Sequence, residues 1–416
     1  MTFLVLNRRP ILDRIPDWLD DLGHDLVLVT ARSVAPDRVL EEVAGRYREV
    51  VVIDDYDHSD VERLALSLAQ RHRVERVLTT AEIDVLRAAR IRERLGLPGQ
   101  GVESATAYRD KFVMKTIAAR AGIPVARMRP VRSAADLRAL AEEGGFPIVV
   151  KPLAGAGSVG VRVVPDHPAL DRLVAELGEI VPGRLLAETW VSGEVLVVDG
   201  LMAGGKLLQC WPIRLRYPNL AAATDGKPNT GWMLRRGDEL GERLLAFVSE
   251  VVAALPAPEE VTGVHAEVFH TADGRLVLDE IASRPGGTGH TPTFERAFGV
   301  NLYGASLRGQ AGWYDADELA RQPRALVGFA FFMRRHGRLV EVPAACPLPG
   351  VVDFTSTARA GAEYAAPRSI TDFLARILVE APHGTDLDGP VSEVAEWWGS
   401  ACRWAPPDVQ PGNVSG

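Results

Sequence analysis

The sequence predicts a multidomain α/β and α+β protein, in which an open parallel α/β domain is followed by α+β units. Along the N-terminal part, the apolar runs TFLVLN, DLVLVTA and EVVVIDDY alternate with helical patterns, as in a parallel sheet wrapped by helices. A glycine-rich loop then lies between two apolar runs at residues 146–164, and longer runs typical of hairpins follow from Gly193. The chain has 416 residues, 47% of them hydrophobic and 25% charged, which is enough for two or three cores.

The charge and the cysteine pattern argue against several classes of partner and site. The net charge is -8 and the isoelectric point about 5.7, so no general attraction to nucleic acid or to an anionic membrane surface is expected. No apolar run approaches the roughly 20 residues of a transmembrane helix, and the first is too short for a secretory signal. Cys210, Cys346 and Cys402 lie far apart without a CxxC motif, which argues against disulfides or zinc and favours a cytoplasmic location.

The N-terminal strand–helix series is interpreted as a domain spanning residues 1–103. Its first strand runs into LNRRPILDR without a GxGxxG motif, so we expect a scaffold or substrate wall rather than a dinucleotide-binding turn. The segment LGLPGQGVESATAY at 95–108 contains glycines and a proline and marks the domain boundary. Helices are expected at 15–22, from Pro36, at 59–71 and at 82–95.

Two further units are expected, a small lobe at 104–192 and a large lobe at 193–405. The small lobe contains a helix that begins near the tripeptide RDK, the glycine-rich loop between two strands, and the strand RLLAETWV. The large lobe contains hairpin strands and a polar loop at 217–237, and residues 406–416 resemble a frayed tail. Further helices are expected from Ser133, at 168–177, at 238–255 and around 391–398.

A hairpin in the large lobe brings two glutamates together. Asp273–Gly274 lies between two alternating apolar runs and predicts a two-residue type I′ turn. In that register Glu267 lies directly across from Glu280, where like charges destabilise a sheet unless a cation neutralises them. Mg²⁺ commonly takes one or two carboxylates together with substrate phosphates, so the pair predicts a metal site. An exposed glutamate pair at a solvated edge, or a slipped register, is the alternative.

The glycine-rich loop PLAGAGSVGV follows Lys151 at the end of an apolar strand. Glycines allow the backbone to approach phosphate oxygens, and successive N–H groups in such a loop form an anion-binding concavity. A lysine held by packing supplies a fixed positive charge for nucleotide phosphates. The Walker motif GxxxxGK[ST] is absent, and an ordinary glycine-rich hairpin loop beside a solvated lysine is the alternative.

Four motifs in a fixed order resemble the ATP-grasp superfamily of carboxylate–amine ligases over roughly residues 1–315. They are RDK, IVVKPLAGAGSVGV, LLAETWVSGE and GVHAEVFHTADGRLVLDEIASRPGG, and they follow the N-terminal open α/β domain. The resemblance implies an ATP-grasp fold, in which two α+β lobes clasp ATP. The sequence is similar to the stand-alone L-amino-acid and dipeptide ligases and to the biotin-carboxylase-like group. It resembles the former more closely, because no biotin-carrier segment is present.

The resemblance also implies roles for individual residues in binding ATP. Two lysines match those that contact the phosphates, and the loop from Gly155 to Gly160 matches the one that closes over the β- and γ-phosphates. The linker strand meets adenine largely through backbone groups, an acid after it holds the ribose, and an apolar residue lies under the adenine ring. In that order the implied residues are Lys111, Lys151, Gly155, Gly157, Ser158, Glu188, Trp190, Val191, Glu194 and Phe269.

The metal and the reacting groups are implied in the same way. Glu267 and Glu280 match the metal-binding acids, and Arg284 and Lys151 are the implied catalytic residues, with Arg284 beside the acyl phosphate. Many family members have an asparagine ligand where this sequence has Ala282, which puts the second metal in doubt. The implied cofactors are ATP and one or two Mg²⁺ ions, with Mn²⁺ as an alternative.

The implied activity is ATP-dependent ligation of a small, amino-acid-like carboxylate to an amine, with an acyl phosphate intermediate and release of ADP and phosphate. A small-metabolite kinase and a non-catalytic ATP-binding scaffold are the alternatives. The expected partners are small molecules, namely the carboxylate and the amine. The oligomeric state is left open, with a homodimer as one possibility. The substrates are not identified, and selectivity is expected in the 217–237 loop, the segment GGTGHTPTFER and the N-terminal domain.

Four further side chains near these motifs have open roles. His265 is interpreted as a strand residue that fills the cleft floor, and His290 as within reach of substrate but without an identified partner. For Arg214 and Arg216, carboxylate binding and a solvated strand position are both open. Glu280→Gln and Lys151→Ala are expected to abolish ADP formation while leaving the thermal unfolding midpoint nearly unchanged.

Overall fold

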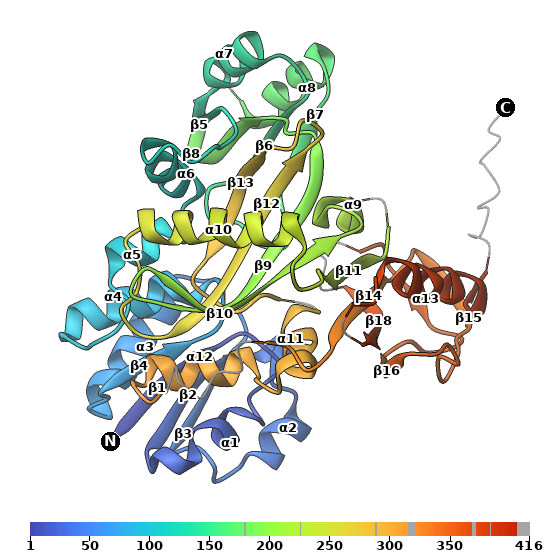
Figure 1. Ribbon diagram of the computed structural model, residues 1–416. Coiled ribbons are helices and arrows are strands. Elements are labelled where there is room, and N and C mark those ends of the chain that lie inside the picture. The colour runs from blue at the N-terminus through green and yellow to red at the C-terminus, as the bar shows by residue number, and fades with distance from the viewer. Residues whose placement is uncertain are drawn as a thin grey trace, which may run out of the picture.

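A computed structural model describes residues 1–178, 180–224, 226–287, 289–314, 322–367, 372–382 and 384–405. It shows a large central sheet with the N-terminal sheet below it and a small lobe above it, and the C-terminal strands extend the central sheet on one side (Figure 1). The expected tail at 406–416 lies outside the described residues. No helix in the described ranges is long and apolar enough to cross a membrane.

The N-terminal sheet is parallel, as predicted, with strand order β3-β2-β1-β4. Successive residues of β1 enter opposite cores: Phe3 and Val5 pack on one face, while Leu4 and Leu6 pack on the other. Such a strand is buried on both sides, which explains its unbroken apolar run. The elements are β1 (Thr2–Asn7), α1 (Ile15–Leu19), η1 (Asp20–Leu22), β2 (Asp25–Ala31), η2 (Arg32–Val34), α2 (Asp37–Glu42), β3 (Glu49–Ile53), α3 (Asp60–Arg71), β4 (Arg76–Thr79) and α4 (Asp84–Leu95).

The small lobe is an antiparallel sheet with strand order β5-β8-β6-β7, covered by α7 and α8. The side chain of Ser133 begins α7 in a capping box with Asp136, and Asp110 caps α6 by accepting hydrogen bonds from the amides of Phe112 and Val113. The elements of the lobe are β5 (Met128–Ser133), α7 (Ala134–Gly144), β6 (Ile148–Pro152), β7 (Arg162–Val164), α8 (His167–Leu177) and β8 (Ile180–Thr189). The preceding helices, α5 (Val102–Ala107) and α6 (Lys111–Arg120), pack instead in a core against the large sheet.

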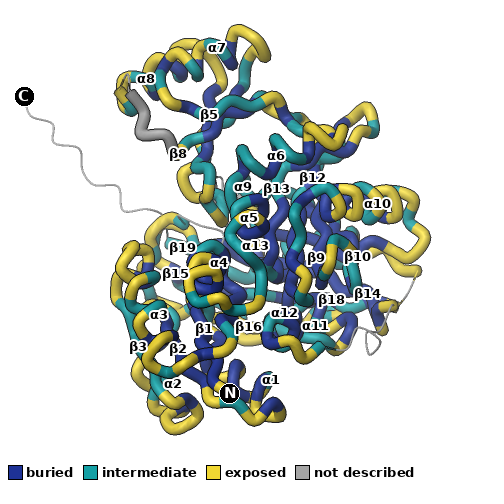
Figure 2. The backbone as a smooth tube through the Cα atoms, turned by 90° about the vertical axis from the view of Figure 1, so that its left-hand side faces the viewer, coloured by how far each residue is buried: buried dark blue, intermediate teal, exposed yellow. Residues whose placement is uncertain are grey.

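The large sheet has eight strands in the order β13-β12-β9-β10-β11-β14-β18-β16, and the pairs between them are antiparallel. Its strands run through the buried centre of the molecule, whereas α7 and α8 of the small lobe carry many exposed residues (Figure 2). The strands are β9 (Gly193–Ala203), β10 (Lys206–Leu215), β11 (Asn229–Met233), β12 (Thr262–Thr271), β13 (Leu276–Ala282), β14 (Leu326–Met333), β16 (Val351–Ser356) and β18 (Phe373–Ala381), beside a small sheet of β15 (Gly337–Glu341), β17 (Glu363–Tyr364) and β19 (Arg403–Trp404).

Two expectations about the elements of the large lobe are corrected by the structure. The segment 217–237 is not simply a loop, because it contains α9 and β11, and β11 is fully buried between β10 and β14. Two helices that follow the glycine turn, α11 and α12, were not predicted, since glycines and threonines there are weak helix formers. The helices are α9 (Asn219–Thr224), α10 (Glu239–Ala254), α11 (His290–Phe298), α12 (Leu302–Gln310) and α13 (Asp388–Ala401).

The hairpin of β12 and β13 pairs Glu267 with Glu280, as predicted, but through a different turn. The last pair at the turn is Thr271 with Arg275, so the loop has three residues, and only Gly274 in it has a positive φ, of 80°. The predicted two-residue type I′ turn is therefore wrong, because that turn needs positive φ at both central residues. A β-bulge at Asp279 shifts the register back, so the two errors cancel at the glutamate pair.

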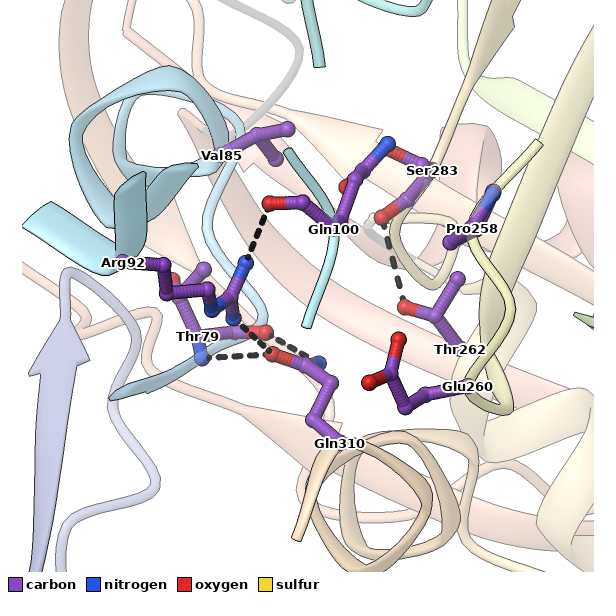
Figure 3. Close-up of a pocket in the computed structure, with 9 residues that line it drawn as sticks. All are labelled: Thr79, Val85, Arg92, Gln100, Pro258, Glu260, Thr262, Ser283 and Gln310. Atoms are coloured by element: carbon purple, nitrogen blue, oxygen red, sulfur yellow. Dashed lines mark hydrogen bonds between the residues drawn. The ribbon is translucent and has the colours of Figure 1, made fainter. Parts of the chain in front are cut away.

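A buried polar joint connects the N-terminal sheet to the large lobe (Figure 3). The side-chain amide of Gln310, at the end of α12, accepts a hydrogen bond from the Thr79 amide at 3.0 Å and donates one to the Thr79 carbonyl at 2.7 Å. It thereby pairs with the edge strand β4 as a further strand would. Arg92 donates to the same Gln310 oxygen at 3.2 Å, beside a cavity of about 10 Å³, so this joint is nearly solid.

Candidate functional site

A cavity of about 290 Å³ lies between the small lobe and the large sheet. Its lining comes from the loop after β6, the linker after β8, strands β12 and β13, and two residues of the N-terminal domain. Twelve of the thirteen site residues expected from the sequence line it: Lys111, Lys151, Gly155, Gly157, Ser158, Glu188, Trp190, Val191, Glu267, Phe269, Glu280 and Arg284. Segments far apart in the sequence therefore meet in one place.

Glu194 is the expected residue that does not line this cavity. Its neighbours Gly193 and Val195 do, and side chains alternate along a strand, so the Glu194 carboxylate lies outside the lining. It is paired instead with Arg214, whose Nε lies 2.9 Å away, and with His270, whose Nδ1 lies 2.8 Å away. Arg216 forms an ion pair with Asp388. Both arginines thus bind carboxylates of the protein itself.

The paired glutamates on the cavity floor each contact a different donor. The Oε1 atom of Glu267 accepts a hydrogen bond from the Asn219 side chain at 2.9 Å and lies 3.2 Å from His265 Nε2. The Oε1 atom of Glu280 lies 2.8 Å from Lys111 Nζ. Two separate donors therefore offset the like-charge repulsion across the hairpin.

The side chains around this pair have the chemistry expected for the magnesium that the resemblance implies. Within the described ranges, no group of three or more histidine, cysteine, aspartate or glutamate side chains could hold a metal by itself. Two opposed carboxylates nevertheless fit Mg²⁺, which binds one or two carboxylates and completes its shell with phosphates and water. Ala282 is fully buried and offers no side-chain oxygen, so the missing asparagine has no substitute at that position.

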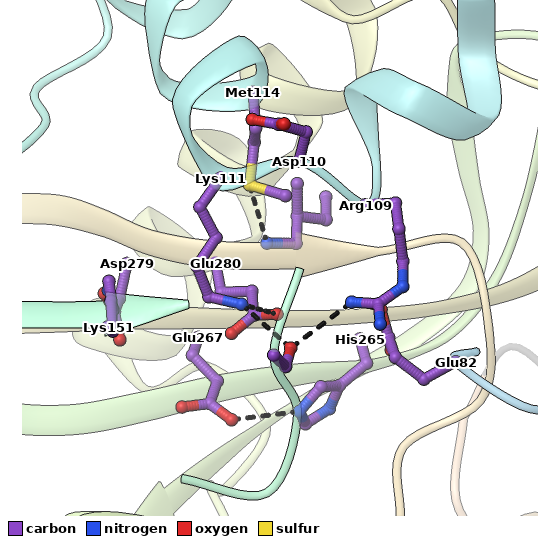
Figure 4. A network of polar contacts seen from close by, with 12 residues as sticks. Glu82, Arg109, Asp110, Lys111, Met114, Lys151, His265, Glu267, Asp279 and Glu280 are labelled. Atoms are coloured by element: carbon purple, nitrogen blue, oxygen red, sulfur yellow. Dashed lines mark hydrogen bonds and ion pairs between the residues drawn. The ribbon is translucent and has the colours of Figure 1, made fainter. Parts of the chain in front are cut away.

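Beside the glutamates, two lysines and two carboxylates form a network in which the charges alternate in sign, and Figure 4 shows Lys151 and Asp279 of this network. Lys151 Nζ lies 2.8 Å from Asp279 Oδ1 and 2.9 Å from Glu188 Oε2. Lys115 Nζ lies 2.6 Å from Glu188 and 3.3 Å from Asp279. Burial alone would lower the pKa of Lys151, but the two carboxylates raise it above its ordinary value. Burial alone would raise the pKa of Asp279, but Lys151 and Lys115 hold it well below its ordinary value. The ion pairs therefore outweigh burial and keep Lys151 and Asp279 charged.

Sequence reasoning missed two members of this cluster, Lys115 and Asp279. Lys115 carried a usable signal, because it follows Lys111 by four residues on α6 and so lies on the same helix face. Asp279 carried none. In a regular strand it would face away from Glu280, and only the β-bulge places both acids on the cavity wall.

A third group of charges lies where the N-terminal domain meets the cavity. The carboxylate of Glu82, which the sequence reasoning also missed, accepts a hydrogen bond from Arg284 Nε at 2.5 Å and lies 3.2 Å from Arg109 Nη1. Burial alone would raise the pKa of Glu82, but Arg284, Arg109 and Lys111 lower it to about 2. Arg284 therefore enters the cavity already held by an ionised partner.

This depressed pKa predicts how stability depends on pH. Replacing Glu82 with glutamine is expected to lower the free energy of unfolding by about 2–3 kcal/mol at neutral pH, because two buried arginines lose their partner. The carboxylate stabilises the fold fully above its ordinary pKa of 4.5 and ceases to do so as the pH falls towards 2. Unfolding midpoints of the wild type and the variant should therefore converge on acidification; a constant difference would contradict the assigned pKa.

The glycine-rich loop contains a tight turn with several positive φ angles. Gly157 and Ser158 have consecutive positive φ angles of 63° and 62°, and Gly160 has a φ of 76°. The Gly155 carbonyl accepts hydrogen bonds from Lys111 Nζ at 3.1 Å and Arg109 Nη1 at 3.3 Å. The loop is thus held beside the cavity by Arg109 and by Lys111, which lines the cavity.

Gly160→Ala is expected to raise the KM for ATP several-fold with little effect on stability. A Cβ atom there would occupy a positive-φ position and lie 3.1 Å from Pro152 Cγ, so the loop would have to change shape. Gly45→Ala is the matched control, because Gly45 has a φ of 86° with nothing within 4 Å and lies in the N-terminal domain. A variant with unchanged KM for ATP would exclude this loop from nucleotide binding.

Two families of protein domain match this chain. Residues 20–99 match the ATP-grasp N-terminal domain, and residues 116–296 match the ATP-grasp domain. The second match contains the glycine-rich loop, the linker strand and both glutamates of the hairpin. The matched segments are thus the ones that surround the cavity.

Several named proteins are similar to this chain. An L-arginine-specific L-amino acid ligase of Bacillus subtilis is 28% identical over 62% of this chain and 63% of its own length. A D-alanine–D-alanine ligase of Ectopseudomonas mendocina is 30% identical over 50% of this chain and 67% of its own length. This chain thus spans less than two thirds of the first relative.

The fold is also similar to solved structures. The crystal structure of an L-amino acid ligase from Bacillus licheniformis superposes with a TM-score of 0.72 over 97% of this chain and 98% of that one. The identity between the two is 17%, so this likeness concerns the fold. It extends over the C-terminal strands, which lie beyond the matched domain models.

Proposed function

The chain belongs to the ATP-grasp family, and on that premise we propose that it is an ATP-dependent ligase for small, amino-acid-like substrates. It would join a carboxylate to an amine through an acyl phosphate and release ADP and phosphate. The observation that carries the proposal is the single cavity in which paired acids, buried lysines and a glycine-rich loop meet. The names of its relatives, which include ligases for arginine and for D-alanine, support amino acids as the substrate class.

In the first step a carboxylate oxygen of the substrate attacks the γ-phosphorus of ATP, and the bond from that phosphorus to the β-γ bridging oxygen breaks. The two anions repel each other, so catalysis depends on positioning and on fixed positive charge. Lys111 and Lys151 would supply that charge from the cavity wall, and the amides of the loop at Gly157 and Ser158 would bind the phosphates. Glu267 and Glu280 would hold Mg²⁺, which when bound with the phosphates reduces the same repulsion.

In the second step the amine displaces phosphate from the acyl phosphate. Arg284 lies in the cavity with its guanidinium fixed by Glu82, so it can stabilise the charge on the carbonyl and phosphate oxygens without rearranging. The loop over the cavity would exclude water, which otherwise hydrolyses the acyl phosphate. No side-chain nucleophile is required.

The test is a screen of amino-acid pairs for ADP release, followed by mass analysis of the product. Release of ADP and phosphate that depends on both a carboxylate and an amine, with an amide product, supports the ligase. ADP with a stable phosphorylated product would show a kinase instead. ATP binding without ADP formation from any amino-acid pair would indicate a non-catalytic ATP-binding scaffold and would contradict the proposal.

A further inference from the structure

A buried aspartate joins two histidines at the floor of the cavity. Asp199, on β9, is fully buried, and its Oδ1 lies 2.8 Å from His265 Nδ1 across the β9–β12 pair. Its Oδ2 lies 2.7 Å from His290 Nδ1, within ion-pair distance but without the alignment of a hydrogen bond. Both imidazole rings line the cavity, and their centroids are 5.2 Å apart. Asp199 is thus the partner of His290 that the sequence did not identify.

The two histidines have different surroundings. His265 lies between two carboxylates, since its Nε2 is 3.2 Å from Glu267, so both of its nitrogens carry hydrogens and it cannot accept a proton. His290 has a carboxylate at Nδ1 only, and no described residue forms a hydrogen bond or ion pair with its Nε2. We assign the hydrogen of the neutral ring to Nδ1, where the carboxylate oxygen lies closest, and this tautomer leaves the lone pair on Nε2.

We propose that His290 is the general base that accepts the proton of the attacking amine. The inference rests on the proposed ligase function and concerns its second step. The amine nitrogen forms a bond to the carbonyl carbon, the bond from that carbon to the phosphate oxygen breaks with its electron pair, and the proton lost from nitrogen moves to His290 Nε2. Asp199 acts through the ring as a positioning residue, because it fixes the tautomer and stabilises the imidazolium that forms.

Other groups of the cavity are poorly suited to this task. Lys111 and Lys151 are ion-paired cations and cannot accept a proton. Glu82 is held ionised by two arginines, and its low pKa makes it a weak base. Asp199 on β9 and His265 on β12 face His290, β14 contributes the ring of Phe329, and Arg284 after β13 lines the same cavity. An imidazole oriented by a buried carboxylate is the usual form of a base that works near neutral pH.

The experiment compares two nucleophiles for the same acyl phosphate. Hydroxylamine is largely unprotonated at neutral pH, so it can attack the acyl phosphate without a base. Hydroxamate formation therefore measures formation of the acyl phosphate and transfer of the acyl group, and it does not require His290. An amino-acid amine needs the base. In His290→Asn, which keeps a donor near Asp199, amide formation should fall by about 10²- to 10⁴-fold while hydroxamate formation changes little. His72→Asn is the matched control, because His72 also contacts a carboxylate, Glu49 at 2.6 Å, but lies in the N-terminal domain.

A second variant, His290→Ala, tests the same role by rescue. Added imidazole should restore part of its amide formation, and the restored rate should follow the concentration of neutral imidazole as the pH is raised. Equal loss of amide and hydroxamate formation in the two variants, or no loss of either, would overturn the assignment of His290. A wild-type protein that forms neither hydroxamate nor ADP would instead overturn the ligase proposal on which the inference rests.

Discussion

Lys151→Ala is expected to abolish ADP formation and also to lower the free energy of unfolding by about 3–5 kcal/mol. The sequence alone suggested an effect on activity only, but Lys151 is buried between Asp279 and Glu188, and its side chain is 8% exposed. Without it, two buried carboxylates share the single charge of Lys115. The variant should therefore show a lower unfolding midpoint in calorimetry together with the loss of ADP release.

A compensating change separates the two effects. In Lys151→Met/Asp279→Asn, Lys115 and Glu188 remain as a balanced pair, so most of the lost stability should return. Activity should not return, because the charge that faces the phosphates is still absent. Recovery of ADP formation in this double variant would show that Lys151 serves the fold and not the reaction.

Glu280→Gln is expected to lower the rate of ADP formation at least about 100-fold with a small change in stability. The amide keeps an acceptor for Lys111 but loses the negative charge that a divalent cation requires. Its side chain is 20% exposed, so the fold depends on it less than on Lys151. ADP release and the Mg²⁺ concentration for half-maximal activity should both be measured.

Glu380→Gln provides the matched control for Glu280. Glu380 also lies on a strand of the large sheet and pairs with a cation, Arg296, but it does not line the cavity. It should retain the activity and the magnesium dependence of the wild type. If Glu280→Gln also requires no more Mg²⁺ than the wild type, Glu280 does not hold the metal.

The sequence predicted the fold well where one periodicity dominates. The N-terminal strands are apolar throughout because both faces are covered, and their alternation with helices identified a parallel sheet. The segment 217–237 was misread as a loop, because its strand β11 has few β-branched residues and becomes buried only through its neighbours β10 and β14. Tertiary packing, rather than local preference, makes that strand.

The candidate site shows the same division. Residues in contiguous motifs, such as Lys151 and the glycine loop, could be identified from the sequence, and the structure places them in one cavity. Asp199, Glu82 and Asp279 could not, because each acts through a partner far away in the chain. The position of Asp279 also depends on a β-bulge, which is one extra residue in strand β13. The pattern of apolar residues does not predict such a bulge.

The joint at Gln310 has a mechanical consequence for the cavity. Because this side chain completes the edge of β4 and also binds Arg92, the N-terminal sheet and the large lobe cannot separate without breaking buried hydrogen bonds. We therefore expect these two walls of the cavity to move together. An opening that admits a nucleotide is then expected to come from movement of the small lobe relative to the large sheet.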